Sequence, residues 1–223
     1  FSGGIFAHEK IYLVPYKSSG IITLDLNTGE FSRIESLGSV TGCSGGIFEG
    51  DFIYLIPFTG DSMYKINYSD NSLEKIAVPQ IANAQFSGGA FDGRNIWMSP
   101  YSGGTVVKYD TFAGEFTSYE LPDTREQYKS GTFDGKNVWL SPLSGNTLLK
   151  ISGTNNPPVA MNLFLEVEAG KEVTGEFSAQ DDNTGDTISF RTETEPFPGT
   201  LIYDSITGNF TYTAGTLSGV DEF

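Results

Sequence analysis

Histidine and cysteine, the side chains that most often serve as metal ligands or nucleophiles, each occur once in this chain of 223 residues. Zinc centres and Cys/His catalysis need several such groups at defined spacings, so both are excluded. His8 takes the place that glycine holds in three related segments, at Gly50, Gly93 and Gly135. Because histidine tolerates positive φ better than most residues, we predict that His8 is a turn residue.

Cys43 stands where two related segments have phenylalanine, at Phe1 and Phe86. We therefore predict a small, buried apolar side chain and not a nucleophile. A single cysteine also rules out a disulfide within the chain. The absence of an intrachain disulfide argues against a eukaryotic secreted domain and leaves a prokaryotic surface protein open.

Three aspartates in one loop, Asp181, Asp182 and Asp186, are the best candidate for a binding site. Clustered carboxylate oxygens suit Ca²⁺, which takes six to eight oxygen ligands. The alternative is an acidic turn that only keeps the loop hydrated. Paired carboxylates for glycoside hydrolysis also stay open, because Asp and Glu are numerous and the sequence singles out no pair.

Three aromatic residues, Tyr16, Phe58 and Tyr101, follow a proline at equivalent places in the related segments. Aromatic rings on an exposed rim could stack on sugars, which makes glycans a candidate ligand. The simpler interpretation is that these rings pack neighbouring repeats together.

Composition narrows the classes of partner. The net charge is −15, with 13 Lys plus Arg against 28 Asp plus Glu, which disfavours nucleic acid and anionic membrane surfaces as partners. The sequence contains no run of 18 apolar residues, so membrane insertion is not predicted. The acidity is compatible with calcium, with an extracellular setting, or simply with solubility. Abundant glycine (27 residues) and few charges (18%) favour short strands and turns over helices.

A repeat of about 42 residues covers positions 1–151, with copies that begin at Phe1, Cys43, Phe86 and Tyr128. The third copy predicts four strands, at 87–91, 95–100, 105–110 and 116–121, separated by glycine turns. The second strand is apolar on both faces, and Pro100 should end its ladder because proline lacks an N–H. Four antiparallel strands per repeat are typical of a β-propeller blade, with the small first strand near the axis. The four blades could belong to a larger propeller or close alone.

The motifs of the third copy resemble the blades of virginiamycin B lyase-like and NHL-type propellers. They are Asp92-Gly93, Trp97, Lys108-Tyr109-Asp110, Gly114-Glu115-Phe116 and Tyr119-Glu120-Leu121-Pro122. The resemblance implies blade architecture. The lyase activity would require a His–Glu arrangement with a metal, and Glu9 follows His8, but the chain has no second histidine. That activity is therefore not carried over.

A proline-rich linker at 152–160 separates the repeats from a second domain at 161–223. Short strands predicted at 163–167, 173–177, 187–192, 200–204 and 209–213 favour an Ig-like β-sandwich. The segments NNPPVA, DDNTGDTISF, PFPGTLIYDSITGNFTYT and SGVDEF resemble the cadherin-like, Ig-type modules of bacterial surface proteins and adhesins. The expected fold class is thus all-β: propeller blades followed by an Ig-like domain.

Both domains look incomplete. The fourth repeat lacks a counterpart of 116–121, and the Ig-type pattern normally continues after SGVDEF. We expect either a longer polypeptide or strands supplied by other copies or other surface proteins. The predicted function is a non-enzymatic structural or binding segment of a secreted or cell-surface prokaryotic protein, such as an adhesin or filament. A carbohydrate-binding propeller and a propeller-type lyase or hydrolase are the alternatives.

Overall fold

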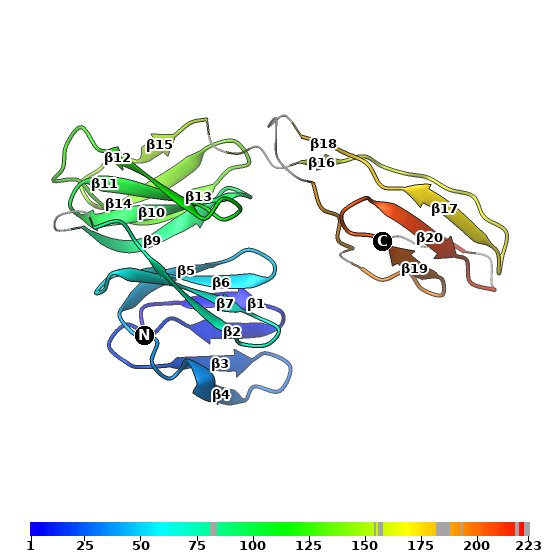
Figure 1. Cartoon of the computed structure of the whole chain (residues 1–223), viewed down its shortest axis with the longest axis horizontal. Helices are drawn as coiled ribbons and strands as arrows, with labels where there is room; N and C mark the ends of the chain where they lie inside the picture. The colour runs from blue at the N-terminus through cyan, green and yellow to red at the C-terminus, as the bar shows by residue number, and fades with distance from the viewer. Residues whose placement is uncertain are drawn as a thin grey trace. The chain divides into compact units, whose positions relative to one another are not determined.

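The computed structural model describes residues 1–80, 84–153, 155, 158–181, 188–192, 194–216 and 219–220. The chain divides into two compact units, Phe1–Asn155 and Asn156–Phe223. Apart from the one-turn helix η1 (Glu35–Leu37), every regular element is a β-strand (Figure 1). No helix among the described residues has the length and apolarity to cross a membrane.

The first unit consists of β-propeller blades, each an antiparallel sheet whose strands follow chain order. Blade one contains β1 (Gly4–Ala7), β2 (Lys10–Leu13), β3 (Ile21–Asp25) and β4 (Phe31–Ile34). Blade two contains β5 (Cys43–Phe48), β6 (Phe52–Pro57), β7 (Ser62–Asn67) and β8 (Leu73–Ala77). Blade three contains β9 (Gln85–Phe91), β10 (Asn95–Ser102), β11 (Thr105–Asp110) and β12 (Glu115–Glu120). Blade four contains β13 (Gln127–Phe133), β14 (Val138–Ser144) and β15 (Leu149–Ile151).

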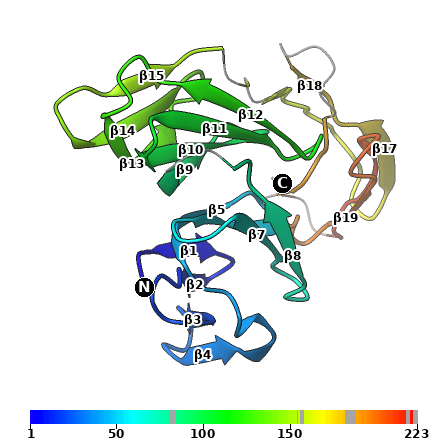
Figure 2. The same cartoon turned by 60° about the vertical axis from the view of Figure 1, so that its left-hand side comes forward.

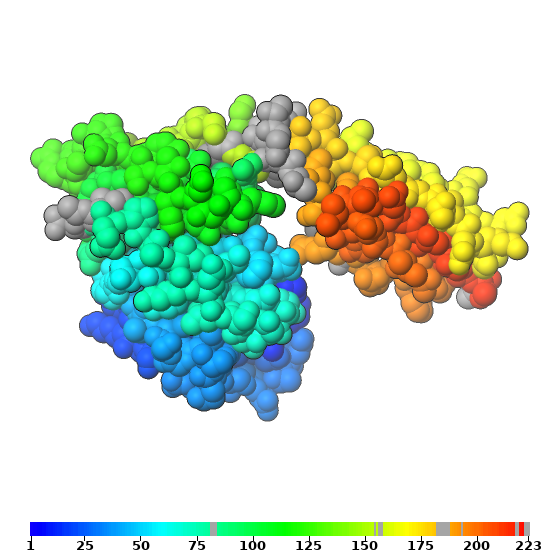
Figure 3. Space-filling model, in the orientation of Figure 1, coloured from blue at the N-terminus to red at the C-terminus, as the bar shows by residue number. Residues whose placement is uncertain are grey.

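The blades follow one another in space as they do in sequence, with the first and the fourth at the two ends (Figures 1 and 2). In the space-filling view the first unit is one continuous body from blue to yellow-green (Figure 3). The propeller repeat and the small first strand near the axis are confirmed. Strands β1, β5, β9 and β13 lie side by side, and a methyl group added at Gly45 would come within 2.8 Å of the Gly88 backbone.

Hydroxyl groups tie these inner strands together. Ser2 Oγ donates to the carbonyl of Cys43 at 2.9 Å, and Ser87 Oγ donates to the carbonyl of Tyr128 at 2.6 Å. Both serines hold the same repeat position, so the same side chain links blade one to two and blade three to four. Small residues in the first strand therefore serve both close approach and hydrogen bonding.

The second strand of blade three is buried on both faces, as predicted, with Ile96, Trp97 and Met98 all in the core. The prediction that its ladder ends at Pro100 is wrong. Strand β10 continues to Ser102, and its register with β9 shifts on both sides of Pro100. The irregular pairing allows the ladder to pass a residue that has no N–H.

The described residues of the second unit contain five short strands. Strands β16 (Val159–Ala160) and β18 (Ala179–Gln180) pair with each other. Strands β17 (Glu172–Glu176), β20 (Asn209–Thr213) and β19 (Thr200–Tyr203) form a three-stranded sheet with β20 in the centre. Phe210 and Tyr212 are its buried side chains, and the Phe210 ring stacks on Phe177 with centroids 4.6 Å apart.

Two strands predicted for this unit are not found. Residues 161–168 form no strand although Leu163, Leu165 and Val167 alternate, and residues 188–192 form none either. Thr187 lies outside the described residues. Alternation specifies a face but not a partner, and no described strand pairs with these segments to complete a ladder. The interpretation as a cadherin-like Ig-type module stays a prediction.

The turn that enters the second strand of blade three is built around a buried carboxylate. Asp92 accepts hydrogen bonds from Trp97 Nε1 (2.7 Å), from Asn95 through its backbone and side chain, and from the backbone N–H of Asn155 (3.2 Å). The equivalent Asp134 of blade four accepts from Trp139 Nε1 (2.6 Å) but is exposed. These hydrogen bonds hold the pKa of Asp134 well below its usual range.

Replacing Asp92 with alanine should destabilise the first unit by about 3 kcal/mol, because the buried indole and amide donors lose their acceptor. Asp134→Ala is the matched control, since it removes the same motif from an exposed turn and should cost much less. Urea unfolding followed by tryptophan fluorescence measures both. Equal losses for the two variants would show that burial of Asp92 is not the cause.

Candidate functional site

The predicted aromatic residues Tyr16, Phe58 and Tyr101 come together in one row across blades one to three. The rings of Tyr16 and Phe58 are 5.3 Å apart, and those of Phe58 and Tyr101 are 4.9 Å apart. Both contacts are edge-to-face and all three side chains are half-buried. Each ring therefore packs a face or an edge against its neighbour. Such edge-to-face contacts are typical of aromatic packing, here between neighbouring blades. Sugar binding by this row stays a prediction.

A second cluster lies at the opposite end of the second strands, in the turns of blades one and two. His8 and Glu9 have φ of 45° and 59°, so His8 does take the left-handed turn conformation of the glycines at its repeat position. Its ring stacks on Tyr68 at 3.8 Å, and His8 Nε2 lies 3.3 Å from the carbonyl oxygen of Gly50. The imidazole therefore helps to join two neighbouring turns.

Glu49, which the sequence did not single out, has the most perturbed carboxyl of this cluster. It takes the repeat position of Asp92 and Asp134, one methylene longer. Burial raises its pKa to about 7, with a further increase from Asp51 and a smaller opposing effect of Lys65. A carboxyl that titrates near neutrality is suited to proton transfer. The sequence signal that could have singled out Glu49 was its alignment with the turn aspartates. Its burial, which raises the pKa, depends on packing that the sequence does not show.

Cys43 is fully buried, and burial raises the pKa of its thiol to about 12. The prediction of a core side chain is confirmed, because a thiol that stays protonated at neutral pH is a poor nucleophile. Among the described residues, no three His, Cys, Asp or Glu side chains are grouped so that they could hold a metal ion. Asp181 is half-buried after β18, whereas Asp182 and Asp186 lie outside the described residues.

A polar cleft of about 340 Å³ lies where blade three passes into blade four. Arg125 and Asp123 form an ion pair at 2.8 Å along one side, and Tyr128 donates to Glu126 at 2.8 Å. The Arg125 guanidinium lowers the pKa of Asp123 to about 2. These charged groups satisfy one another, so the cleft presents paired and not free charges.

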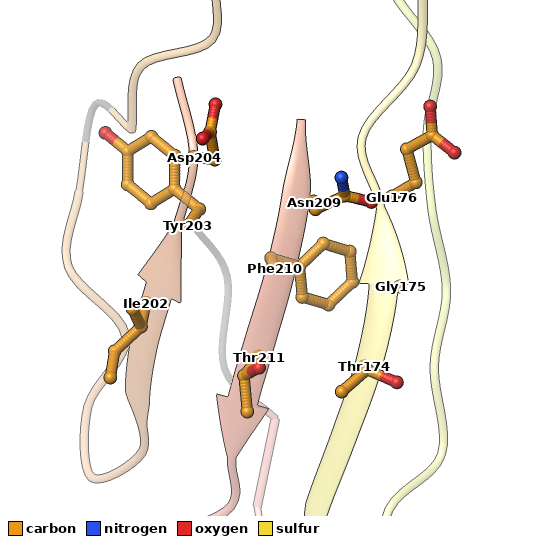
Figure 4. Close-up of a pocket in the computed structure, with 9 residues that line it drawn as sticks. All are labelled: Thr174, Gly175, Glu176, Ile202, Tyr203, Asp204, Asn209, Phe210 and Thr211. Atoms are coloured by element: carbon orange, nitrogen blue, oxygen red, sulfur yellow. The ribbon is translucent and has the colours of Figure 1, made fainter. Parts of the chain in front are cut away.

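An open groove of about 730 Å³ crosses the three-stranded sheet of the second unit (Figure 4). The Phe210 ring lies over Gly175, where any larger residue would overlap it. At the edge, Asp204 accepts the backbone N–H groups of Ile206 and Thr207, which lowers its pKa. Its carboxylate thus closes the turn between β19 and β20, and the groove contains no arranged set of catalytic groups among its described residues.

No protein-family model matches the chain, and no curated protein matches its sequence. Solved structures do share its fold. Virginiamycin B lyase from Staphylococcus aureus has a TM-score of 0.55 at 14% identity, over 68% of this chain and 52% of the lyase. An auxiliary nutrient binding protein from Bacteroides thetaiotaomicron has a TM-score of 0.53 at 12% identity, over 95% of this chain and 52% of that one. The structure of a nidogen/laminin complex matches with a TM-score of 0.53 at 12% identity, over 65% and 55% of the two chains.

This chain spans about half the length of each of these structures. The likeness to virginiamycin B lyase confirms propeller repeats of the kind that the sequence motifs indicated. A lyase and a nutrient-binding protein share the fold, so the likeness shows architecture and no particular activity.

The raised pKa of Glu49 predicts a pH dependence of stability. The folded state holds the proton more tightly than the unfolded chain, so this contribution is complete below about pH 4.5 and is lost as the pH rises through about 7. Because the carboxyl is only partly shielded from water, we expect a loss of about 1 kcal/mol between pH 5 and pH 8. Glu49→Gln should remove that part of the decline.

Urea unfolding at pH 5 and pH 8 measures this loss of stability. Glu115→Gln, at an exposed carboxylate of blade three, is the control and should leave the difference between pH 5 and pH 8 as in the wild type. An unchanged pH dependence in Glu49→Gln would contradict the assignment.

Proposed function

We propose that the chain is a non-enzymatic structural or binding segment of a large secreted or cell-surface prokaryotic protein, such as an adhesin or a component of an extracellular filament. One observation carries this proposal. The segment 159–165 of the second unit presents a run of apolar side chains to solvent, with Phe164 89% and Val159 66% exposed. A contiguous patch of exposed apolar side chains is typical of a surface for association.

Residues 163–165 of this segment belong to the predicted strand 163–167, which pairs with no described strand, whereas Val159–Ala160 form β16 and pair with β18. A chain with the alternating pattern of Leu163, Leu165 and Val167 is suited to join a strand of another molecule, which would supply the missing hydrogen bonds. Strand β20 has both edges paired within the chain, so among the described strands the outer edges of the three-stranded sheet are those of β17 and β19. Other copies of this chain or other surface proteins are the proposed partners, and the second unit is proposed to be an Ig-type module.

Catalysis finds less support in the described residues. The one histidine is stacked between turns and the one cysteine is in the core. Glu49 has a suitable pKa, but the described residues contain no group of side chains that could hold a metal ion. A binding or structural role needs none of these groups. The propeller architecture occurs both in enzymes and in proteins with binding or structural roles.

Phe164→Ser should weaken association of the chain by about tenfold, because the exposed ring is removed from the contact surface. Light scattering after size-exclusion chromatography, over a range of concentrations, measures the mass against 24.2 kDa for one chain. Ile206→Ser is the matched control, since Ile206 is also exposed but lies in the turn before β20. A mass of one chain at every concentration, or equal effects of the two variants, contradicts the assigned surface.

Asp181, Asp182 and Asp186 are proposed as ligands of a calcium ion. Saturation at about a hundred times the dissociation constant would stabilise the second unit by about 2.7 kcal/mol. We therefore expect a chelator to lower the melting temperature of the wild type and to leave Asp186→Asn unchanged. Calorimetry with and without the chelator measures it, and an unchanged wild-type melting temperature rejects the site.

A further inference from the structure

The groove of the second unit lies on the face of the three-stranded sheet that is opposite to the buried Phe210 and Tyr212. Side chains alternate along a strand, and residues opposite each other in a ladder share a face. The register therefore places two rows of side chains across the groove, one above the other in Figure 4. We call Glu176, Asn209 and Asp204 the acceptor row, and Thr174, Thr211 and Ile202 the hydroxyl row.

The acceptor row presents oxygen atoms that take hydrogen bonds. Glu176 and Asp204 are exposed carboxylates. A carboxylate has about four acceptor sites, so Asp204 can take a further donor beside the backbone N–H groups of Ile206 and Thr207. The Asn209 side chain donates to Thr207 Oγ1 at 3.0 Å, which leaves its carbonyl oxygen as an acceptor. A ligand of this row must therefore donate hydrogen bonds.

The charge of the groove is negative. Two of its nine described lining residues are acidic, and none of them is Lys, Arg or His. The N–H groups of Thr207 and Ile206 lower the pKa of Asp204, so this side chain stays ionised. In the sequence, positions 156–223 contain twelve Asp or Glu against two Lys or Arg. The ligand that complements this charge is a cation.

The hydroxyl row adds two further requirements. Thr174 and Thr211 lie opposite each other, and their hydroxyl groups can both donate and accept. Ile202 lies beside Thr211 and is 76% exposed, so it offers an apolar contact. Strand spacing and rise give the two rows an extent of roughly 10 Å by 7 Å. A ligand that meets both rows is an extended molecule with cationic, hydroxyl and apolar groups.

Two other kinds of cation fit this arrangement less well. Ca²⁺ needs six to eight oxygen atoms that converge on one point, whereas the acceptor row is spread over three strands. A basic peptide gains main-chain hydrogen bonds at the edge of a sheet. The groove crosses a face instead, where β20 is already paired on both sides, so it offers side chains and no free ladder.

We propose that the groove binds an oligosaccharide with free amino groups, such as a chain of linked glucosamine units. Its ammonium groups donate to the carboxylates of the acceptor row. Its ring hydroxyl groups pair with the hydroxyl row, and a C–H face of one ring packs on Ile202. The inference rests on the proposed binding role, to which it adds the chemical class of a ligand, and it does not involve residues 159–165.

Isothermal titration calorimetry of the whole chain with a glucosamine hexamer at pH 6 tests the site. We expect one hexamer to bind per chain, with an affinity that falls at least tenfold between low salt and about 0.5 M sodium chloride. The N-acetylated hexamer has the same length and no charge, so it should bind at least tenfold more weakly.

Glu176→Gln should weaken binding of the glucosamine hexamer about tenfold, because one carboxylate of the acceptor row is lost. Glu168→Gln is the matched control, since Glu168 is also exposed but precedes β17 and does not line the groove. It should bind the hexamer as the wild type does. Circular dichroism and the melting temperature check that both variants fold.

Three results would overturn the proposal. The first is a wild type that binds no glucosamine hexamer. The second is equal binding of the N-acetylated hexamer or of spermidine, a cation without sugar rings. The third is equal affinity of Glu176→Gln and Glu168→Gln.

Sugar binding and association of the chain can fail separately. A chain that associates through Phe164 and binds no hexamer rejects the groove and supports the proposed function. A chain that binds the hexamer but keeps the mass of one copy at every concentration supports the groove and rejects the 159–165 surface.

Discussion

The second strand of each blade is apolar on both faces, and the architecture of the first unit depends on that constraint. Burying one such side chain is worth roughly 1.5–3 kcal/mol, so a blade gains most of its stability from the blades beside it. Strand β10 shows both contacts, with Met98 in the core shared with blade two and Trp97 in the core shared with blade four. The inner strands must then come close enough for Gly45 to lie against Gly88.

Turn chemistry varies between copies while the backbone path stays the same. Blade three uses a buried Asp92 that holds the Trp97 indole, and blade four uses an exposed Asp134 for the same bond. Blade two has Glu49 at this position, with a raised pKa, and blade one replaces the turn glycine with His8. The repeat therefore tolerates change wherever a local hydrogen bond or a stacked ring can hold the turn.

How far the sequence predicts the structure depends on where the partner of each segment lies. Strand β11 was predicted with its observed bounds, because its neighbours lie a few residues away across glycine turns. Residues 163–167 were predicted as a strand and form none, because alternation cannot reveal whether a distant partner exists. The row of Tyr16, Phe58 and Tyr101 was found from spacing, but its edge-to-face geometry was not. The sequence did not predict the burial of Glu49 either, because burial depends on three-dimensional packing.

Exposed apolar side chains occur in a segment that the sequence predicted incorrectly, at Phe164, and at repeat positions that are buried in other blades, at Leu148. Leu148 and Phe6 belong to faces that the repeat buries elsewhere, and Phe164 belongs to an alternating segment without a ladder. We propose that the exposed apolar side chains of the segment 159–165, with Phe164 the most exposed, form a contact with another surface.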